Sequence, residues 1–258
     1  GDSLSMNRLG THIILGDLKG VKPGEGLKWI TQSAQQGYAL AQSNLGRFWY
    51  DGDQVEEQDY SKAKEWFQKA AEQNYPVAQF RLGKFYLTGP GKFKPNIIEA
   101  IKWFRLAARQ GLPDAQFALG GIYMDGTGGT EKDPQTGYYW LEISRRSGMR
   151  GVDATLKRYE NDLTQEQKQR AIAQAAKFRA SNFYNENTGG SGNPPAAAKL
   201  GQLSLKDLTA QANTGDADAQ FHLAERYAGG RGIALDPVQA WKWYQLADEG
   251  DHPTAAAA

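Results

Sequence analysis

The chain contains no cysteine, few histidines and no long apolar run, and each shortage excludes a class of function. Without cysteine it can form neither disulfides nor thiolate metal sites, an absence compatible with both reducing and oxidising compartments. Its 30 basic and 29 acidic residues leave a formal net charge of +1, which gives no reason to expect binding to nucleic acid. A membrane helix needs roughly 18 to 20 apolar residues, and no run in the sequence approaches that length. We therefore expect no membrane insertion.

The three histidines are too far apart in the sequence to indicate catalysis or metal binding. His12, His222 and His252 form no pair with metal-ligand spacing, and none is placed as the base of a nucleophilic triad. The glycine clusters at 126–129 and 229–232 are interpreted as inter-helix loops, because no phosphate-loop motif accompanies them. No catalytic residue, cofactor or metal site is predicted, and the chain is not expected to be an enzyme.

What the sequence does have is a repeat with a period of 37 residues. Four tryptophans follow one another at this spacing, and the pattern Ala-Gln-x-x-Leu-Gly recurs with the same interval. The tryptophans are Trp29, Trp66, Trp103 and Trp140, and the pattern begins at Ala41, Ala78 and Ala115. Self-similarity at a fixed period of this size indicates a repeat architecture, in which each unit buries apolar area against its neighbours.

Each unit carries the signals of a helical hairpin, named here helix A followed by helix B. In residues 77–111, apolar residues recur at helical spacing, a Gly-Pro-Gly break follows, and Asn96 offers its side chain as the N-cap of helix B. Helix B then ends at Gly111, where a left-handed conformation costs least. Other units have matching caps at Asp59, Asp133 and Asp236, and matching stops at Gly37, Asn74, Gly148 and Gly250.

Two further expectations concern packing within a unit. Small residues such as Gly46 and Gly120 should let the two helices approach closely and leave a slot for the tryptophan ring. His12 falls in the sequence column of Phe48 and Phe85, so we expect its side chain to be partly buried.

The repeated pattern resembles the Sel1-like repeat, a helical repeat of the tetratricopeptide-like superfamily. The resemblance lies in Ala-Gln-x-x-Leu-Gly-x-x-Tyr, a glycine-rich loop, an aspartate cap and Ala-x-x-Trp-x-x-x-Ala-Ala-x-x-Gly. Units fit at residues 5–37, 41–74, 78–111, 115–148 and 219–250. The resemblance implies an all-α fold, a right-handed α/α solenoid of helical hairpins. Many Sel1-like proteins carry paired cysteines, so this chain is similar to the cysteine-free branch, and penicillin binding is not transferred to it.

The array is interrupted once along the chain. Residues 1–150 are predicted to hold four repeats, and 151–181 the closing helices, one of which starts with a capping box at Thr164 and runs to about Ala180. Residues 182–200 have the composition of a flexible linker. Residues 201–258 are predicted to hold a half unit and a fifth repeat. The sequence stops where another helix A should begin, so we expect this end to be truncated or to carry a very short helix.

A solenoid exposes a concave surface made from one helix per repeat, and in Sel1-like proteins that helix is usually helix A. Arg47, Arg81 and Lys84 are predicted to form a basic patch in this groove, bordered by Phe48 and Tyr50, that suits an acidic peptide or the carboxylates of a glycan. A solvated helix face with ordinary positive residues is the alternative interpretation. The full set of candidate partner-binding residues is Asn44, Arg47, Phe48, Tyr50, Arg81, Lys84, His222 and Trp241.

The resemblance and the lack of a catalytic constellation favour a non-catalytic protein–protein interaction scaffold or adaptor. We expect it to act in the bacterial envelope or outside the cell, periplasmic or secreted after removal of a leader; a cytoplasmic location is the alternative. The alternative function is a cell-wall or polysaccharide ligand-binding, or enzymatic, module, which would require a deep pocket with convergent polar groups. Self-association through the C-terminal repeat is a third hypothesis.

Overall fold

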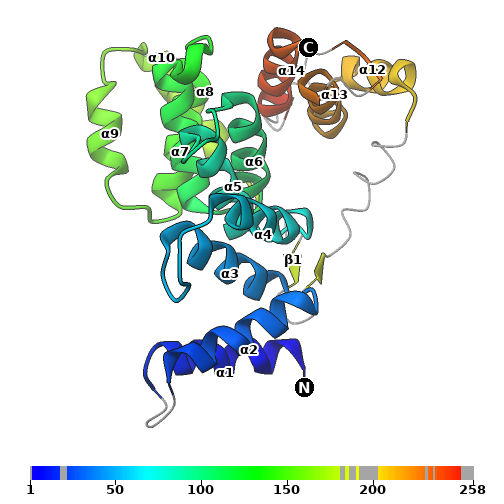
Figure 1. The fold of residues 1–258 in the computed structure, drawn as a ribbon. Helices are drawn as coiled ribbons and strands as arrows, with labels where there is room; N and C mark the ends of the chain where they lie inside the picture. The colour runs from blue at the N-terminus through cyan, green and yellow to red at the C-terminus, as the bar shows by residue number, and fades with distance from the viewer. Residues whose placement is uncertain are drawn as a thin grey trace. The chain divides into compact units, whose positions relative to one another are not determined.

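A computed structural model shows a chain of consecutive helical hairpins (Figure 1). It describes residues 2–17, 22–180, 184–185, 190–191, 203–229, 232–234 and 236–250. The chain divides into two compact units, Gly1–Pro95 with Asn182–Gly192 (unit 1) and Asn96–Ser181 with Asn193–Ala258 (unit 2). The predicted all-α solenoid fold is confirmed. In the described part of the chain the only strands are β1 (Tyr184–Asn185) and β2 (Gly190–Ser191), which pair antiparallel.

Unit 1 contains two hairpins and the first helix of a third. Its helices are α1 (Ser3–Ile14), α2 (Pro23–Gln35), α3 (Ala39–Asp51), α4 (Tyr60–Glu72) and α5 (Pro76–Thr88). The core between α2 and α3 is made of Ile30, Ala34, Tyr38, Ala41, Leu45 and Phe48. Helix B of one repeat therefore packs against helix A of the next, which is how a stack without a single central core buries its apolar area.

Unit 2 continues the array and also contains the fifth repeat. Its helices are α6 (Ile97–Arg109), α7 (Pro113–Asp125), α8 (Pro134–Arg146), α9 (Val152–Arg158), α10 (Gln165–Ala175), α12 (Leu205–Asn213), α13 (Ala217–Gly229) and α14 (Pro237–Gly250), with a 3-10 turn, η1 (Thr127–Gly129), before α8. Ile98 and Leu106 of α6 pack against a cluster of Ala224, Ala240 and Ala247 from α13 and α14. The fifth repeat therefore returns to α6 (Figure 1).

The helix caps and stops follow the sequence signals. Asp59 accepts hydrogen bonds from the backbone amides of Ser61 and Lys62, at 2.9 and 3.0 Å, and Asn96 accepts one from Glu99 at 3.1 Å. The stops at Gly37, Asn74, Gly111 and Gly148 all adopt left-handed φ values, as such stops require.

The capping box at Thr164 is present, but the helix that it starts is shorter than predicted. α10 ends at Ala175 and not near Ala180. Three residues beyond the helix end, the Phe178 ring lies edge-on to the Trp140 ring, with centroids 6.1 Å apart. The helix therefore ends before Phe178, and the Phe178 ring packs against Trp140 of α8.

In four of the five repeats a buried glutamine links the repeat to the helix before it. The side-chain amide of the Ala-Gln motif donates a hydrogen bond to the backbone carbonyl eight residues earlier, near the end of the preceding helix. The pairs are Gln42 with Ala34, Gln79 with Ala71, Gln116 with Ala108 and Gln220 with Ala212, at 3.1 to 3.3 Å. A helix leaves its last carbonyls without an intrahelical partner. The motif glutamine supplies a donor to one of them across the repeat boundary.

The predicted slot for the tryptophan ring is wrong by one residue. A Cβ added at Gly46 would lie 2.6 Å from the Phe67 ring, and one at Gly120 would lie 2.5 Å from Cγ of Leu141. Phe67 and Leu141 each follow a tryptophan of the repeat, and both are buried. Because successive helical residues point about 100° apart, only one of the two can face the glycine. The residue after the tryptophan fills the slot.

The expectation that His12 is partly buried is also wrong. Its side chain is 60% exposed, and Nδ1 lies 2.8 Å from Oδ2 of Asp17. The matching Phe48 is buried because it packs against Ile30 and Ala34 of the preceding helix B. Among the described residues no helix precedes α1, so nothing covers the His12 position.

Two further features complete the comparison with the sequence. The predicted linker, residues 182–200, lies outside the described residues except for β1 and β2. None of the helices in the described ranges is both long enough and apolar enough to cross a membrane.

Candidate binding surfaces

The predicted groove residues of unit 1 lie on α3 and α5, the helix A members of their repeats. Among them, the Arg47 side chain is held by two carboxylates and an aromatic ring. Its guanidinium lies 3.4 Å from Asp51, 3.8 Å from Asp53, and 4.6 Å from the centroid of the Phe48 ring. Its side chain is 38% exposed, so the charge reaches solvent from a fixed position. The two carboxylates also offset part of that charge, which the sequence interpretation did not foresee.

Arg81 has a structural position between the two helices. Its guanidinium donates hydrogen bonds to the backbone oxygen of Ser43 at 2.9 Å and to the Ser43 hydroxyl at 2.8 Å. Burial lowers the pKa of Arg81, and the nearby Arg47 lowers it further. An arginine nevertheless stays charged at neutral pH. Arg81 therefore ties α5 to α3, and the charge that it offers a partner is limited.

The other unit 1 candidates divide between surface and core. Lys84 is exposed, with Nζ 5.9 Å from the Phe80 ring centroid. Asn44 is half-buried and donates a long hydrogen bond, 3.5 Å, to Asn7. The remaining two belong to the packing: Phe48 is 2% exposed, and Tyr50 lies in an aromatic cluster with Tyr60, Phe67 and Phe85. Phe48 supports the surface from below and does not line it.

The two candidates from the fifth repeat belong to unit 2. His222 is half-buried on α13. The side chain of Trp241 lies outside the described residues. The structure thus brings together Asn44, Arg47, Arg81 and Lys84 on α3 and α5, and His222 stands on a separate unit.

Sequence reasoning missed a hollow of 510 Å³ beside Trp49 in unit 1. Leu27, Trp49 and Lys62 line it together with the loop of residues 54–59. Nζ of Lys62 lies 4.0 Å from the Trp49 ring centroid and 3.6 Å from a carboxylate oxygen of Asp59. An aromatic face with acidic neighbours suits a cation, and the chain's own lysine takes that place. The signal available in the sequence was the Glu-Glu pair that follows Trp49 in the loop between α3 and α4.

A buried charge cluster in unit 2 is structural. Glu142 is 1% exposed; Arg145 donates to both of its carboxylate oxygens at 2.8 Å, and Arg146 donates to one at 3.0 Å. Burial alone would raise the pKa of Glu142, but hydrogen bonds from the arginines outweigh it and the pKa is lowered. The arginines occupy both carboxylate oxygens of Glu142, so we assign it a structural role. In the described ranges no group of three or more His, Asp or Glu residues is placed to hold a metal ion.

Comparisons with known proteins agree with this architecture. The family model for the Sel1 repeat matches residues 3–38, 39–75, 76–112, 113–149 and 217–252. A search of the curated proteins finds no match. Among solved structures, the chain is similar to c5321, a protective antigen present in uropathogenic Escherichia coli strains and displaying an SLR fold, with 27% identity and a TM-score of 0.58. That match covers 99% of this chain and 57% of the antigen.

A second solved structure, a Sel1 repeat protein from Oxalobacter formigenes, is 27% identical with a TM-score of 0.56 and is matched over 96% of this chain and 88% of its own. The five family matches cover well over half of the sequence, and they coincide with the helical hairpins described above. The chain therefore belongs to the Sel1 repeat family.

Proposed function

We propose that this protein is a non-catalytic scaffold that binds another protein or peptide on the helix A surface of unit 1. Sel1 repeat proteins are generally scaffolds for protein–protein interaction. The observation that supports this location is the pair of cationic side chains that α3 and α5 present to solvent. Arg47 is held in place by Asp51, Asp53 and Phe48, and Lys84 is exposed. Because less side-chain entropy is lost when a charged group is already ordered, Arg47 suits recognition of an acidic segment.

We also propose that the protein acts in the envelope or outside a bacterial cell. The support is the similarity to a protein described as a protective antigen. This chain spans only 57% of that protein, so the antigen's role belongs to a longer chain.

Self-association through the C-terminal repeat is supported by two exposed apolar side chains on α14, Val238 at 62% and Leu246 at 40%.

The test is a cross-linking pull-down followed by binding of the purified partner. The variant is Arg47→Glu with Lys84→Glu; Arg81 is left alone because its replacement would break the link to Ser43. The matched control is Lys92→Glu with Lys94→Glu, which makes the same charge change at two exposed loop residues of unit 1. Loss of partner binding in the first variant only, with unchanged melting temperatures, is expected. Equal binding by both variants would place the partner elsewhere.

A further inference from the structure

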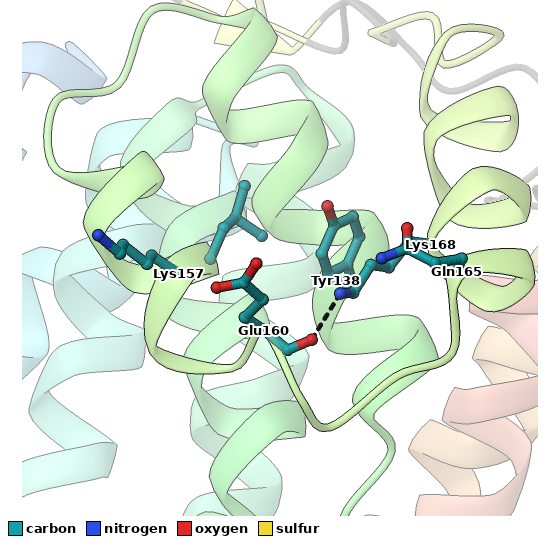
Figure 2. Close-up of a pocket in the computed structure, with 6 residues that line it drawn as sticks. Tyr138, Lys157, Glu160, Gln165 and Lys168 are labelled. Atoms are coloured by element: carbon teal, nitrogen blue, oxygen red, sulfur yellow. Dashed lines mark hydrogen bonds between the residues drawn. The ribbon is translucent and has the colours of Figure 1, made fainter.

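A pocket of 390 Å³ lies in unit 2 among α8, α9 and α10 (Figure 2). Tyr138 reaches it from α8, Leu156 from α9, Glu160 from the segment after α9, and Lys168 from α10. Lys157 and Gln165 complete the lining. Figure 2 shows Tyr138, Gln165 and Lys168 on one side of the pocket, Lys157 on the other, and the Glu160 carboxylate between them. Five of the six lining residues lie on helices, and α10 packs against α8, so we treat the pocket as pre-formed.

Lys168 is the unusual member of this lining. It is 8% exposed, although lysine is almost never buried unless it is paired. Its ammonium group donates one hydrogen bond, to the backbone oxygen of Glu160 (Figure 2). An ammonium group has three N–H donors, and among the described residues no carboxylate lies within ion-pair distance of Lys168. A buried cation with unused donors therefore faces the pocket.

The rest of the lining is suited to an anion of a particular shape. The Tyr138 hydroxyl and the Gln165 side-chain amide add neutral donors. Burial raises the pKa of Tyr138, with a contribution from Glu142, so its hydroxyl stays protonated at neutral pH. Leu156 supplies an apolar wall that can contact the carbon atoms next to a charged group. Such a combination fits a carboxylate carried on a short aliphatic stem, as in a peptide.

We propose that this pocket binds a carboxylate of a partner peptide, with Lys168 as the residue that receives the charge. The inference rests on the proposed scaffold function and names the chemistry of the partner. The carboxylate comes either from an aspartate or glutamate side chain or from the chain's C-terminus. Glu160 stands at the rim with an exposed carboxylate, so it opposes the incoming charge and limits the pocket to a single carboxylate.

The test is an amide NMR titration of the full chain with three peptides that differ only in their carboxylates. The first is acetyl-Gly-Glu-Gly-Glu-Gly with a C-terminal amide, the second has Gln in place of Glu, and the third is the Gln peptide with a free C-terminus. We expect a carboxylate peptide to shift the amides of residues 156–168 and the fully neutral peptide to leave them unchanged. The carboxylate peptide that binds more tightly identifies the source. Equal shifts from the neutral peptide, or none from any peptide, would overturn the proposal.

Three variants assign the role of each charge. Lys168→Met keeps an unbranched side chain, one atom shorter and without the charge, and should weaken binding by about tenfold or more, because a hydrogen-bonded charge pair is lost. Glu160→Gln removes the opposing charge, keeps the backbone oxygen that Lys168 uses, and should strengthen binding. Lys177→Gln is the control, since it removes an exposed lysine just beyond α10. Unchanged affinity in both Lys168→Met and Glu160→Gln would rule the pocket out.

The outcome separates this inference from the proposed function. If the pull-down partner still depends on Arg47 and Lys84 but the peptides do not bind near Lys168, the scaffold stands and the pocket fails. If the peptides bind near Lys168 and the pull-down is insensitive to Arg47 and Lys84, the groove of unit 1 is the part that fails.

Discussion

Two adjacent glycines in α7 should respond in opposite directions to the same substitution. A Cβ at Gly120 would lie 2.5 Å from Cγ of Leu141 and 3.1 Å from the backbone oxygen of Gly137, both on α8. A Cβ at Gly121 would meet nothing within 4 Å. Both positions lie inside the same helix, so the gain in helix propensity from Gly to Ala is the same for the two. The difference between the variants therefore isolates the close approach of α7 to α8.

The magnitudes follow from these two contributions. Replacing glycine by alanine in a helix interior stabilises it by roughly 0.8–1 kcal/mol, and Gly121→Ala should show most of that gain. At Gly120 the new methyl group overlaps a buried Leu141 and a backbone oxygen, neither of which can move freely. Overpacking of this kind costs about 1–3 kcal/mol, partly offset by the same propensity gain. We expect Gly120→Ala to be less stable than Gly121→Ala by about 1–3 kcal/mol.

The assay is urea unfolding followed by tryptophan fluorescence and circular dichroism for the wild type and both variants. The midpoint should fall for Gly120→Ala and rise for Gly121→Ala, with the slope unchanged. Equal midpoints for the two variants would show that α7 and α8 are not in close contact at Gly120, and the argument for the glycine slot would be lost.

Three other substitutions test separate contacts by the same unfolding assay. Tyr159→Phe loses the 2.6 Å hydrogen bond to Asp125 and should cost about 1–3 kcal/mol. Burial raises the pKa of Tyr159 to about 12. As the pH rises from the ordinary tyrosine pKa of 10.0 to about 12, the wild type should therefore lose stability that the variant does not lose. Parallel pH profiles of the two proteins would contradict this. Glu142→Gln should cost about 1–3 kcal/mol of stability at neutral pH. Because the pKa of Glu142 is lowered, the difference in stability between wild type and variant should shrink as the pH falls below the ordinary glutamate range. A difference that does not depend on pH would refute this. Gln116→Met loses two hydrogen bonds, one to the Ala108 oxygen and one from the Ser147 hydroxyl, and should cost about 1–3 kcal/mol. The Ala108 oxygen keeps its bond from the backbone amide of Gly111. No loss relative to the exposed Gln68→Met would contradict the inter-repeat link.

The sequence was sufficient to predict the helical hairpins because their signals are local. An aspartate cap and a left-handed glycine depend only on nearby residues, and the 37-residue period shows where they recur. Asp59 and Gly111 act as predicted. The filling of the glycine slot was not predictable in this way. Trp66 and Phe67 are both apolar and adjacent, and only the rotation of α4 against α3 decides which one faces Gly46.

The candidate surface was predicted less well than the fold, for a related reason. Arg47 and Arg81 both lie on helix A but in different columns of the repeat, since Arg81 aligns with Asn44 and Arg47 with Lys84. Arg47 is partly exposed beside two aspartates, whereas Arg81 donates to Ser43. The prediction grouped the two by charge, and charge alone does not show which side chain turns inward. Lys168 illustrates the reverse case: it reads as part of an ordinary basic helix, and only the position of α9 makes it a buried cation.

The return of the fifth repeat to α6 sets an order of events during synthesis. Neighbouring hairpins close short loops, whereas Ile98 and Ala240 of the same cluster are separated by more than half of the chain. Closing the longer loop costs more entropy and comes later in folding. On the ribosome, the apolar face of α6 at Ile98 and Leu106 therefore emerges well before the helices that cover it. At elongation rates of about 5–20 residues per second this interval lasts roughly 7 to 28 seconds, during which that face is open to a chaperone or to another nascent chain.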